Sequence, residues 1–280
     1  MVEATSNNKP LKAYEDVDFL KQDVCRPVRL QLELLKPDVA MQRENVLSTI
    51  VLMGSARQPS PEAAEAMVAE AEAAVAANPD SEEVKARLRL ARQMERQSEY
   101  YTLARDFAAL ASREGRKKGE GHYIVMTGGG GGIMEAGNRG AADESRQSVG
   151  LNISLPFEQV PNRYITPELN FEFHYFSIRK MHFLMRARAL AAFPGGYGTL
   201  DEVFEALTLI QTRKIPDFPI VLFGREFWQG MVNWEMLRDW GMICPGDLDL
   251  FKICDTAEEG WRCIVEYWDS HGSEPQRNVR

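Results

Sequence analysis

Residues 122–137, HYIVMTGGGGGIMEAG, decide the fold, because they join a strand to a helix through five consecutive glycines. The residues before the glycines form a continuous apolar run, which is typical of a strand buried on both faces of a parallel sheet. The residues after Gly132 begin a helix, and the free N–H groups at such a helix start favour an anion. The stretch therefore predicts an α/β protein with a phosphate-binding loop.

The same alternation of strand and helix continues on both sides of this stretch. Upstream, residues 47–57 read LSTIVLMGSAR, a strand that enters a turn at Gly54 and Ser55. Alternating strands and helices predict crossover units, and hence a Rossmann-like parallel sheet flanked by helices. Further strands are expected at 122–127, 148–155, 171–176, 189–193, 218–224 and 250–254. Helices are expected at 133–146, 177–188, 200–212 and 257–268, and a further helix that contains tryptophan is expected to end at Trp240.

Two helical segments are added to this core. Residues 1–46 predict an N-terminal helical extension, since apolar residues such as Val28 and Leu32 alternate with charges. Residues 61–112 predict an insert after the first strand, with two helices broken near Pro79 and the second of them long. The Rossmann-like domain is then expected at 47–270, followed by a disordered tail at 271–280.

Composition excludes several classes of function. A formal net charge of −8 argues against binding a nucleic-acid polymer, although a few local cations suffice for a small anion. The four cysteines form no CxxC pair and the four histidines no HExxH motif, so we expect reduced thiols and no metal. Apolar runs such as PIVLFG are too short to span a bilayer, and the first residues lack a signal sequence, so we expect a cytoplasmic protein without membrane contact.

A second loop, PGGYGTLDE at residues 194–202, also joins a predicted strand to a helix. The carboxyl ends of parallel strands meet at one rim of the sheet, so both glycine loops and the Gly54 turn are expected to converge there. Thr199 and Glu202 also have the spacing of a capping box, in which both side chains only satisfy their own helix end. Spacing leaves both interpretations open, while the three glycines of the loop favour a ligand site.

Neither loop is a standard nucleotide fingerprint. The five glycines fit no GxGxxG register and no GK[ST] follows them, which argues against NAD and against a P-loop. Arg179 and Lys180 fall in the first turn of a predicted helix, where a cation opposes the helix dipole. An anionic ligand, or Glu202 on the same rim, would offset that cost. His182 and Arg186 share the helix face of Arg179.

Taken together, residues 128–132, the Arg179–Lys180 pair and residues 194–202 resemble the LOG family of cytokinin riboside 5′-monophosphate phosphoribohydrolases, long labelled lysine decarboxylases. The family motif PGGxGTxxE is matched at every fixed position. The resemblance implies that Arg179 and Glu202 are catalytic and that the substrate is a nucleoside 5′-monophosphate. It also implies no cofactor and a homodimer as the basic unit, or a higher homo-oligomer. Lysine decarboxylation would ordinarily call for pyridoxal phosphate and a Schiff-base lysine.

The expected substrate contacts lie in the rim loops and at the start of the arginine helix. They are Gly54, Ser55, Gly129, Gly130, Gly131, Gly132, Lys180, Gly195, Gly196, Gly198 and Thr199. Glu158 is a weaker candidate for a second carboxylate. The extension and the insert are absent from the small plant-type members, so AMP competes with a cytokinin ribotide as substrate. The alternative function is a non-catalytic nucleotide or molybdenum-cofactor carrier, which would need the glycine loops without the Arg179 and Glu202 pair.

Overall fold

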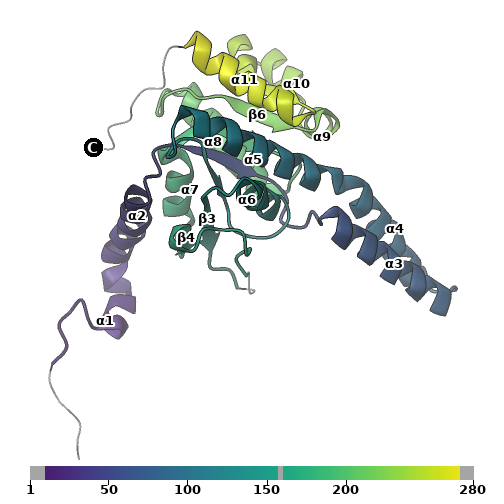
Figure 1. Ribbon diagram of the computed structural model, residues 1–280, viewed down its shortest axis with the longest axis horizontal. Helices are drawn as coiled ribbons and strands as arrows, with labels where there is room; N and C mark the ends of the chain where they lie inside the picture. Colours follow the sequence, from purple (N-terminus) through teal and green to yellow (C-terminus); the bar gives the residue numbers. More distant parts are fainter. Residues whose placement is uncertain (1–9, 157–159, 272–280) are drawn as a thin grey trace, which may run out of the picture.

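Seven parallel strands form a single sheet in the order β4-β3-β2-β1-β5-β6-β7. The computed structural model describes residues 10–156 and 160–271 (Figure 1). The strands are β1 (Thr49–Met53), β2 (Ile124–Thr127), β3 (Ser148–Ile153), β4 (Asn170–Phe173), β5 (Ala187–Ala192), β6 (Ile220–Phe223) and β7 (Phe251–Cys254). The predicted Rossmann-like α/β class is confirmed.

Helices cover both faces of this sheet, as the buried strands require. The helices are α1 (Val17–Lys21), α2 (Arg26–Arg43), α3 (Pro61–Ala77), α4 (Glu82–Gln97), α5 (Glu99–Lys118), α6 (Ile133–Asp143), α7 (Phe176–Met185), α8 (Tyr197–Gln211), α9 (Arg225–Met231), α10 (Trp234–Asp239) and α11 (Ala257–Ser270). Short 3₁₀ turns occur at Asp23–Cys25, Pro167–Leu169 and Pro245–Leu250. Side chains of α5, α6 and α11 form the core on one face, and side chains of α2, α7, α8 and α9 form it on the other.

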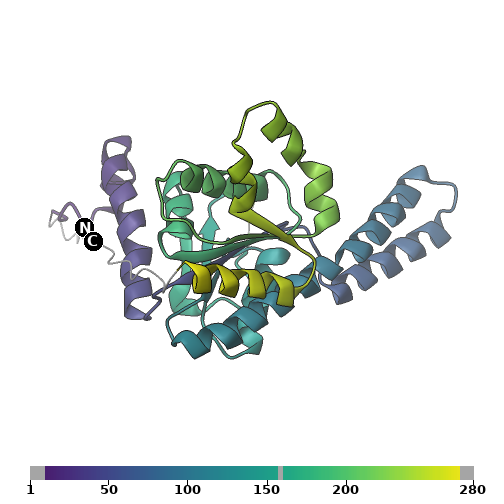
Figure 2. The ribbon, with the colours of Figure 1, turned by 90° about the horizontal axis from the view of Figure 1, so that it is seen from above.

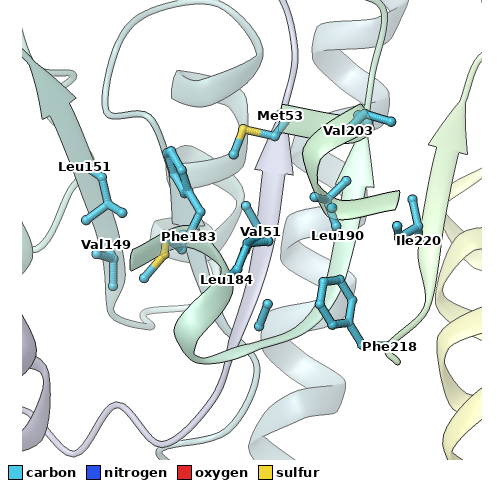
Figure 3. Close-up of a cluster of buried hydrophobic side chains, with 14 of the residues drawn as sticks. Val51, Met53, Val149, Leu151, Phe183, Leu184, Leu190, Val203, Phe218 and Ile220 are labelled. Atoms are coloured by element: carbon cyan, nitrogen blue, oxygen red, sulfur yellow. The ribbon is translucent and has the colours of Figure 1, made fainter. Parts of the chain in front are cut away.

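The central strand β1 shows why the sheet is buried on both sides. All five of its residues are buried, and successive side chains point to opposite faces. Val51 and Met53 join the cluster that contains Phe183 of α7 and Val203 of α8 (Figure 3). Ile50 and Leu52, which alternate with them, belong to the cluster on the other face. This two-sided burial explains the continuous apolar run in the sequence.

The insert after β1 differs from the expectation of two helices, because it contains three. The predicted long second helix is divided at Ser98, whose hydroxyl donates to the carbonyl oxygen of Glu95 at 2.7 Å and competes with the helical ladder. Helices α3 and α4 form a hairpin that projects from the body (Figures 1 and 2). Helix α5 instead packs on the sheet through residues such as Phe107. Its place is therefore in the domain core.

In the described part of the expected N-terminal extension, residues 10–46, helices α1 and α2 are present. Helix α2 is anchored by residues that share the predicted helix face of Arg179. His182 lies with Nε2 3.2 Å from the carbonyl oxygen of Glu33 in α2. Arg186 is buried and pairs with Asp38 of α2 at 2.6 Å. These two members of the predicted polar face therefore hold α2 rather than a ligand. The expected disordered tail lies outside the described residues from position 272 onward.

Candidate active site

The loops that carry the candidate site follow the three central strands, β2, β1 and β5. The chain builds the sheet outward from β1 to β4 on one side and then continues from β5 on the other, so the topological switch point lies between β1 and β5. Open α/β sheets bind ligands at this crevice. Ser55 links the loops, because its N–H donates to Pro194 O and its carbonyl accepts from Ile133 N, both at 3.0 Å. The predicted convergence at one rim is confirmed.

Several glycines of the run at 128–132 are required by contacts within the protein. Gly129 and Gly132 have φ of 78° and 64°, a region that a side chain disfavours. A Cβ at Gly132 would also collide with the carbonyl oxygen of Ser55, and one at Gly128 with the guanidinium of Arg179. By contrast, the nearest atom to a Cβ at Gly131 would be 3.7 Å away. Close packing therefore requires some glycines of the run, such as Gly132, whereas Gly131 has open space beside it.

Gly54 and Ser55 also serve the packing of the rim. A Cβ at Gly54 would overlap the side chain of Ile133 at the start of α6. The Ser55 hydroxyl accepts a hydrogen bond from the N–H of Arg57 at 3.1 Å. Their predicted contact with a substrate stays a prediction, whereas their role in joining the two glycine loops is visible in the structure.

The second loop begins its helix earlier than a capping box would require. The N-cap of α8 is Gly196, no side chain caps the helix, and the first helical residue is Tyr197. Thr199 and Glu202 therefore lie inside the helix and do not satisfy its end. A Cβ at Gly196 or at Gly198 would meet nothing within 4 Å. The capping-box interpretation is wrong, and the loop leaves open space beside these two glycines.

Gly195 and Thr199 form a tight pair at the base of this loop. A Cβ at Gly195 would collide with the Thr199 side chain, which is itself buried. The glycine therefore allows the threonine to fold back onto the loop. The predicted hydrogen bond from the Thr199 hydroxyl to a ligand stays a prediction.

Glu202 is an acidic side chain buried just inside α8, with 7% of its surface exposed. Burial raises its pKa to about 7, although the positive charges of Arg179 and Lys180 lower it. The charge of Arg179 favours the ionised form of this carboxyl group, but desolvation is the larger effect. A carboxyl group with a pKa near 7 can gain or lose a proton at neutral pH, as a general base must.

Arg179 is held in the first turns of α7 and reaches back over the sheet. Its Nε donates to the carbonyl oxygen of Leu151 at 2.7 Å, and an Nη atom lies 3.5 Å from Gly128 O. The guanidinium also lies 5.0 Å from the ring centre of Phe183. Burial lowers its pKa, while the charges of Glu202 and Glu172 oppose this. No carboxylate forms an ion pair with Arg179 in the described chain, so its remaining donors can serve an anion.

Lys180, unlike Arg179, forms ion pairs with carboxylates of the protein. Its Nζ lies 3.0 Å from carboxylate oxygens of both Asp201 and Glu205 on α8. These pairs join α7 to α8 next to Glu202, so the structure gives Lys180 a positioning contact that its sequence neighbours did not reveal. Its direct binding of substrate stays a prediction. The other weak candidate, Glu158, lies outside the described residues.

The sequence did not reveal a buried polar network beneath the first glycine loop. Asn138 of α6 and Asn162, in the loop after β3, lie there with hydrogen bonds to Thr127 and to the glycine backbone. An asparagine on the buried face of α6, one turn after the glycines, is the only local signal. Asn162 has none, because the glycine loop and Asn138, to which it donates, lie more than twenty positions away in the chain.

Nowhere in residues 10–156 and 160–271 do three His, Cys, Asp or Glu side chains gather in a way that could hold a metal ion. The four cysteines are free, with the Sγ atoms of Cys254 and Cys263 3.7 Å apart. None of the helices in the same ranges is both long and apolar enough to cross a bilayer.

The fold and the rim define a Rossmann-like α/β protein whose glycine loops, arginine and buried carboxyl group meet at a switch point. A family model described as possible lysine decarboxylase matches residues 134–264. Cytokinin riboside 5′-monophosphate phosphoribohydrolase LOG3 of Arabidopsis thaliana is 28% identical over 153 residues, which cover 53% of this chain and 69% of the relative. Both matches agree with the resemblance of the chain's motifs to the LOG family.

Two solved structures are similar to the chain at low identity. One is a molybdenum cofactor binding protein from the phototrophic bacterium Rippkaea orientalis, with 19% identity, a TM-score of 0.44, and coverage of 60% of this chain and 87% of that one. The other is a Moco carrier protein from Chlamydomonas reinhardtii, with 16% identity, a TM-score of 0.44, and coverage of 80% of this chain and 99% of that one.

Proposed function

We propose that the protein hydrolyses the N-glycosidic bond of a nucleoside 5′-monophosphate, releasing the free base and ribose 5-phosphate. The substrate is AMP or a cytokinin riboside 5′-monophosphate. The observation that carries the proposal is a buried carboxyl group, Glu202, on the same rim as Arg179 and two glycine loops. The activity in the name of the plant relative agrees with it.

The chemistry follows from the charge that develops in the reaction. Breaking the bond between C1′ and the base nitrogen gives the ribose oxocarbenium character, which a nearby carboxylate stabilises. We assign this role to ionised Glu202, which also accepts a proton from the attacking water. Water supplies the hydroxyl group on C1′, and a proton reaches the departing base.

Binding of the phosphate would place the reacting carbon against this carboxyl group. The N–H groups of residues 130–132 and the open side of Gly196 and Gly198 are suited to an anion, because each lies at the start of a helix. The N–H of Gly129 is used within the protein, since it donates to the Thr127 hydroxyl at 3.0 Å. Arg179 adds a buried positive charge next to Gly128. Fixing the phosphate at a distance from C1′ converts binding into orientation of the reacting atoms.

The direct test is to incubate the purified protein with AMP and with cytokinin and other nucleoside monophosphates, and to follow free base by chromatography. Release of base from at least one of them is the expected result. A protein that binds these nucleotides without releasing base from any of them would instead fit the carrier alternative, because binding needs the loops but not the carboxylate.

Replacing the proposed carboxylate separates catalysis from binding. Glu202→Gln keeps the size of the side chain but can neither take a proton nor carry charge, so base release should fall by about 10²-fold or more. Glu205→Gln is a matched control, since this carboxylate lies one turn further along α8 and pairs with Lys180. Full activity in Glu202→Gln would remove Glu202 from the mechanism.

We propose in addition that the protein forms a homodimer, as its resemblance to the LOG family implies. A hollow of about 600 Å³ is lined by Lys180 of α7 and by residues of α8. Its lining includes Tyr197 and Phe204, two aromatic side chains with exposed surface. Exposed aromatic side chains of this kind are enriched where proteins meet, and a second copy on this face would lie close to the rim.

A further inference from the structure

Asn162 holds the first glycine loop from the protein side. Its side-chain NH₂ group donates to the carbonyl oxygens of Gly129 and Gly130 at 3.2 and 3.0 Å. Its own main-chain N–H donates to Gly129 O at 2.9 Å. Its side-chain oxygen accepts from the N–H of Tyr164 at 3.1 Å. One buried amide group thus fixes two consecutive peptide carbonyls of the loop.

A second asparagine fixes the orientation of this amide group. The side-chain oxygen of Asn138 accepts from the Asn162 NH₂ group at 2.9 Å and from the Thr127 hydroxyl at 2.7 Å. The NH₂ group of Asn138 donates in turn to the hydroxyl of Ser148 at 2.9 Å. Asn138 is fully buried, so this network is protected from water. Reversing the Asn162 amide would place its oxygen against three acceptors.

The orientation of the two carbonyls decides where the N–H groups of the loop point. In a trans peptide the carbonyl and the N–H of the next residue point in opposite directions, and no cis peptide occurs in the described chain. Because Asn162 holds the carbonyls of Gly129 and Gly130, the N–H groups of Gly130 and Gly131 face away from it. Within the described residues, neither N–H donates to a protein acceptor.

Two adjacent N–H groups that face the same side form a concave anion site. Gly131 has open space beside it, since the nearest atom to an added Cβ, Ala56 O, would be 3.7 Å away. Arg179 brings a largely buried positive charge to the beginning of the same loop, beside Gly128. The donors, the space and the charge together fit a phosphate monoester.

We propose that Asn162 is a positioning residue, which aims the N–H groups of Gly130 and Gly131 at the phosphate of the substrate. The inference rests on the proposed function for the identity of the ligand. Asn162 itself touches no substrate, because its NH₂ group is used by the two carbonyls and Asn138. Its loss should therefore act through the phosphate and not through the base or ribose.

The test measures the binding of two ligands by calorimetric titration. Ribose 5-phosphate has the ribose and the phosphate without the base, and adenosine has the ribose and the base without the phosphate. Asn162→Ala removes the donors, and Asn162→Asp turns a carboxylate oxygen toward the two carbonyls. Each variant should weaken binding of ribose 5-phosphate by about tenfold or more, since hydrogen bonds to a charged ligand are lost. Binding of adenosine should stay within about twofold.

Asn233→Ala is the matched control for a general loss of stability. Asn233 caps α10, accepting a hydrogen bond from the N–H of Met236 at 2.9 Å, and has no part in the rim. Its removal should lower the melting temperature by an amount typical of a lost cap and leave both ligands unaffected. If Asn162→Ala does not fold, Asn162→Asp, which keeps the side-chain size, decides the comparison.

The inference would be overturned by unchanged binding of ribose 5-phosphate in the Asn162 variants, or by an equal loss for both ligands. Wild type that releases base from AMP but does not bind ribose 5-phosphate would also overturn it, while the hydrolase proposal survives. Wild type that shows the expected dependence on Asn162 but releases no base from any nucleotide supports the phosphate site and ends the hydrolase proposal.

Discussion

At the scale of single residues, Glu202 and Arg179 form a charged pair that the fold keeps apart. Each is largely removed from water, and the charge of each shifts the pKa of the other toward its ionised form. Yet Arg179 and Glu202 form no ion pair in the part of the chain that the structure describes, and Arg179 donates its hydrogen bonds to main-chain oxygens. Ionising Glu202 is therefore disfavoured until a ligand or water compensates the lost hydration.

The raised pKa of Glu202 predicts how stability depends on pH. The pKa of this carboxyl group is about 7 in the folded protein and close to the ordinary glutamate value of 4.5 in the unfolded chain. Between these pH values the folded state binds more protons, so the free energy of unfolding decreases as pH rises from about 5 to 8. The loss is on the order of 2–3 kcal/mol for a group this well buried.

Urea unfolding of wild type and Glu202→Gln at pH 5 and pH 8 measures this contribution. The variant has no titrating group at this position, so it should lose less stability than wild type over the same range. Equal pH dependence in the two proteins would mean that Glu202 titrates normally. For the same reason kcat/KM should rise with pH through about 7, because only the ionised carboxylate is the proposed active form.

At the scale of elements, the two glycine loops differ in the space around their glycines, which is filled at Gly132 and open at Gly196. Gly132→Ala should lower the free energy of unfolding by at least about 1–2 kcal/mol, because its φ is positive and the new Cβ meets the Ser55 backbone. Gly196→Ala should change stability by less than about 0.5 kcal/mol, since nothing lies within 4 Å. Chemical denaturation of both variants checks the contrast.

The same pair of variants separates packing from ligand contact. If the substrate occupies the open space beside Gly196, the methyl group of Gly196→Ala should raise KM by about tenfold in an otherwise stable protein. A KM equal to that of wild type would place the ligand elsewhere on the rim. The sequence predicted both loops as sites, but it could not say which glycines face a ligand, because their neighbours come from distant segments.

At the scale of the whole molecule, a buried ion pair is one of the contacts that hold the N-terminal extension. Arg186, at the end of α7, has 4% of its side chain exposed and lies 2.6 Å from Asp38 of α2. Asp38→Ala leaves the guanidinium buried without this partner, which should cost about 3–5 kcal/mol in thermal or urea unfolding. The double variant Asp38→Ala with Arg186→Met should recover much of it. Glu82→Ala, which breaks an exposed pair with Lys85, should cost at most about 1 kcal/mol.

The proposed homodimer makes a second prediction at this scale. Sedimentation equilibrium should give twice the chain mass of 31.7 kDa. Phe204→Asp places a charge on the hollow beside α8 and should shift the protein toward a monomer. Met236→Asp, which changes a comparably exposed side chain on α10, should leave the mass unchanged. A wild-type monomer at micromolar concentration would contradict the proposal.

The sequence by itself determined the order of strands and helices and the position of the loops at one rim. These follow from local periodicity and from glycine runs, which a short segment carries. The candidate pair Arg179 and Glu202 came from the resemblance to the LOG family. The sequence misjudged the insert as two helices and left the capping box at Thr199 open.

Only the tertiary structure decided what the side chains meet. Helix α8 begins at Tyr197, so Glu202 has no capping role. Lys180 pairs with two carboxylates, and Asn162 lies beneath the glycine loop. Burial and hydrogen bonding join residues that are far apart in the chain, and spacing along one segment contains no record of them. The fold could therefore be predicted from local patterns, whereas the electrostatics of the site depended on packing.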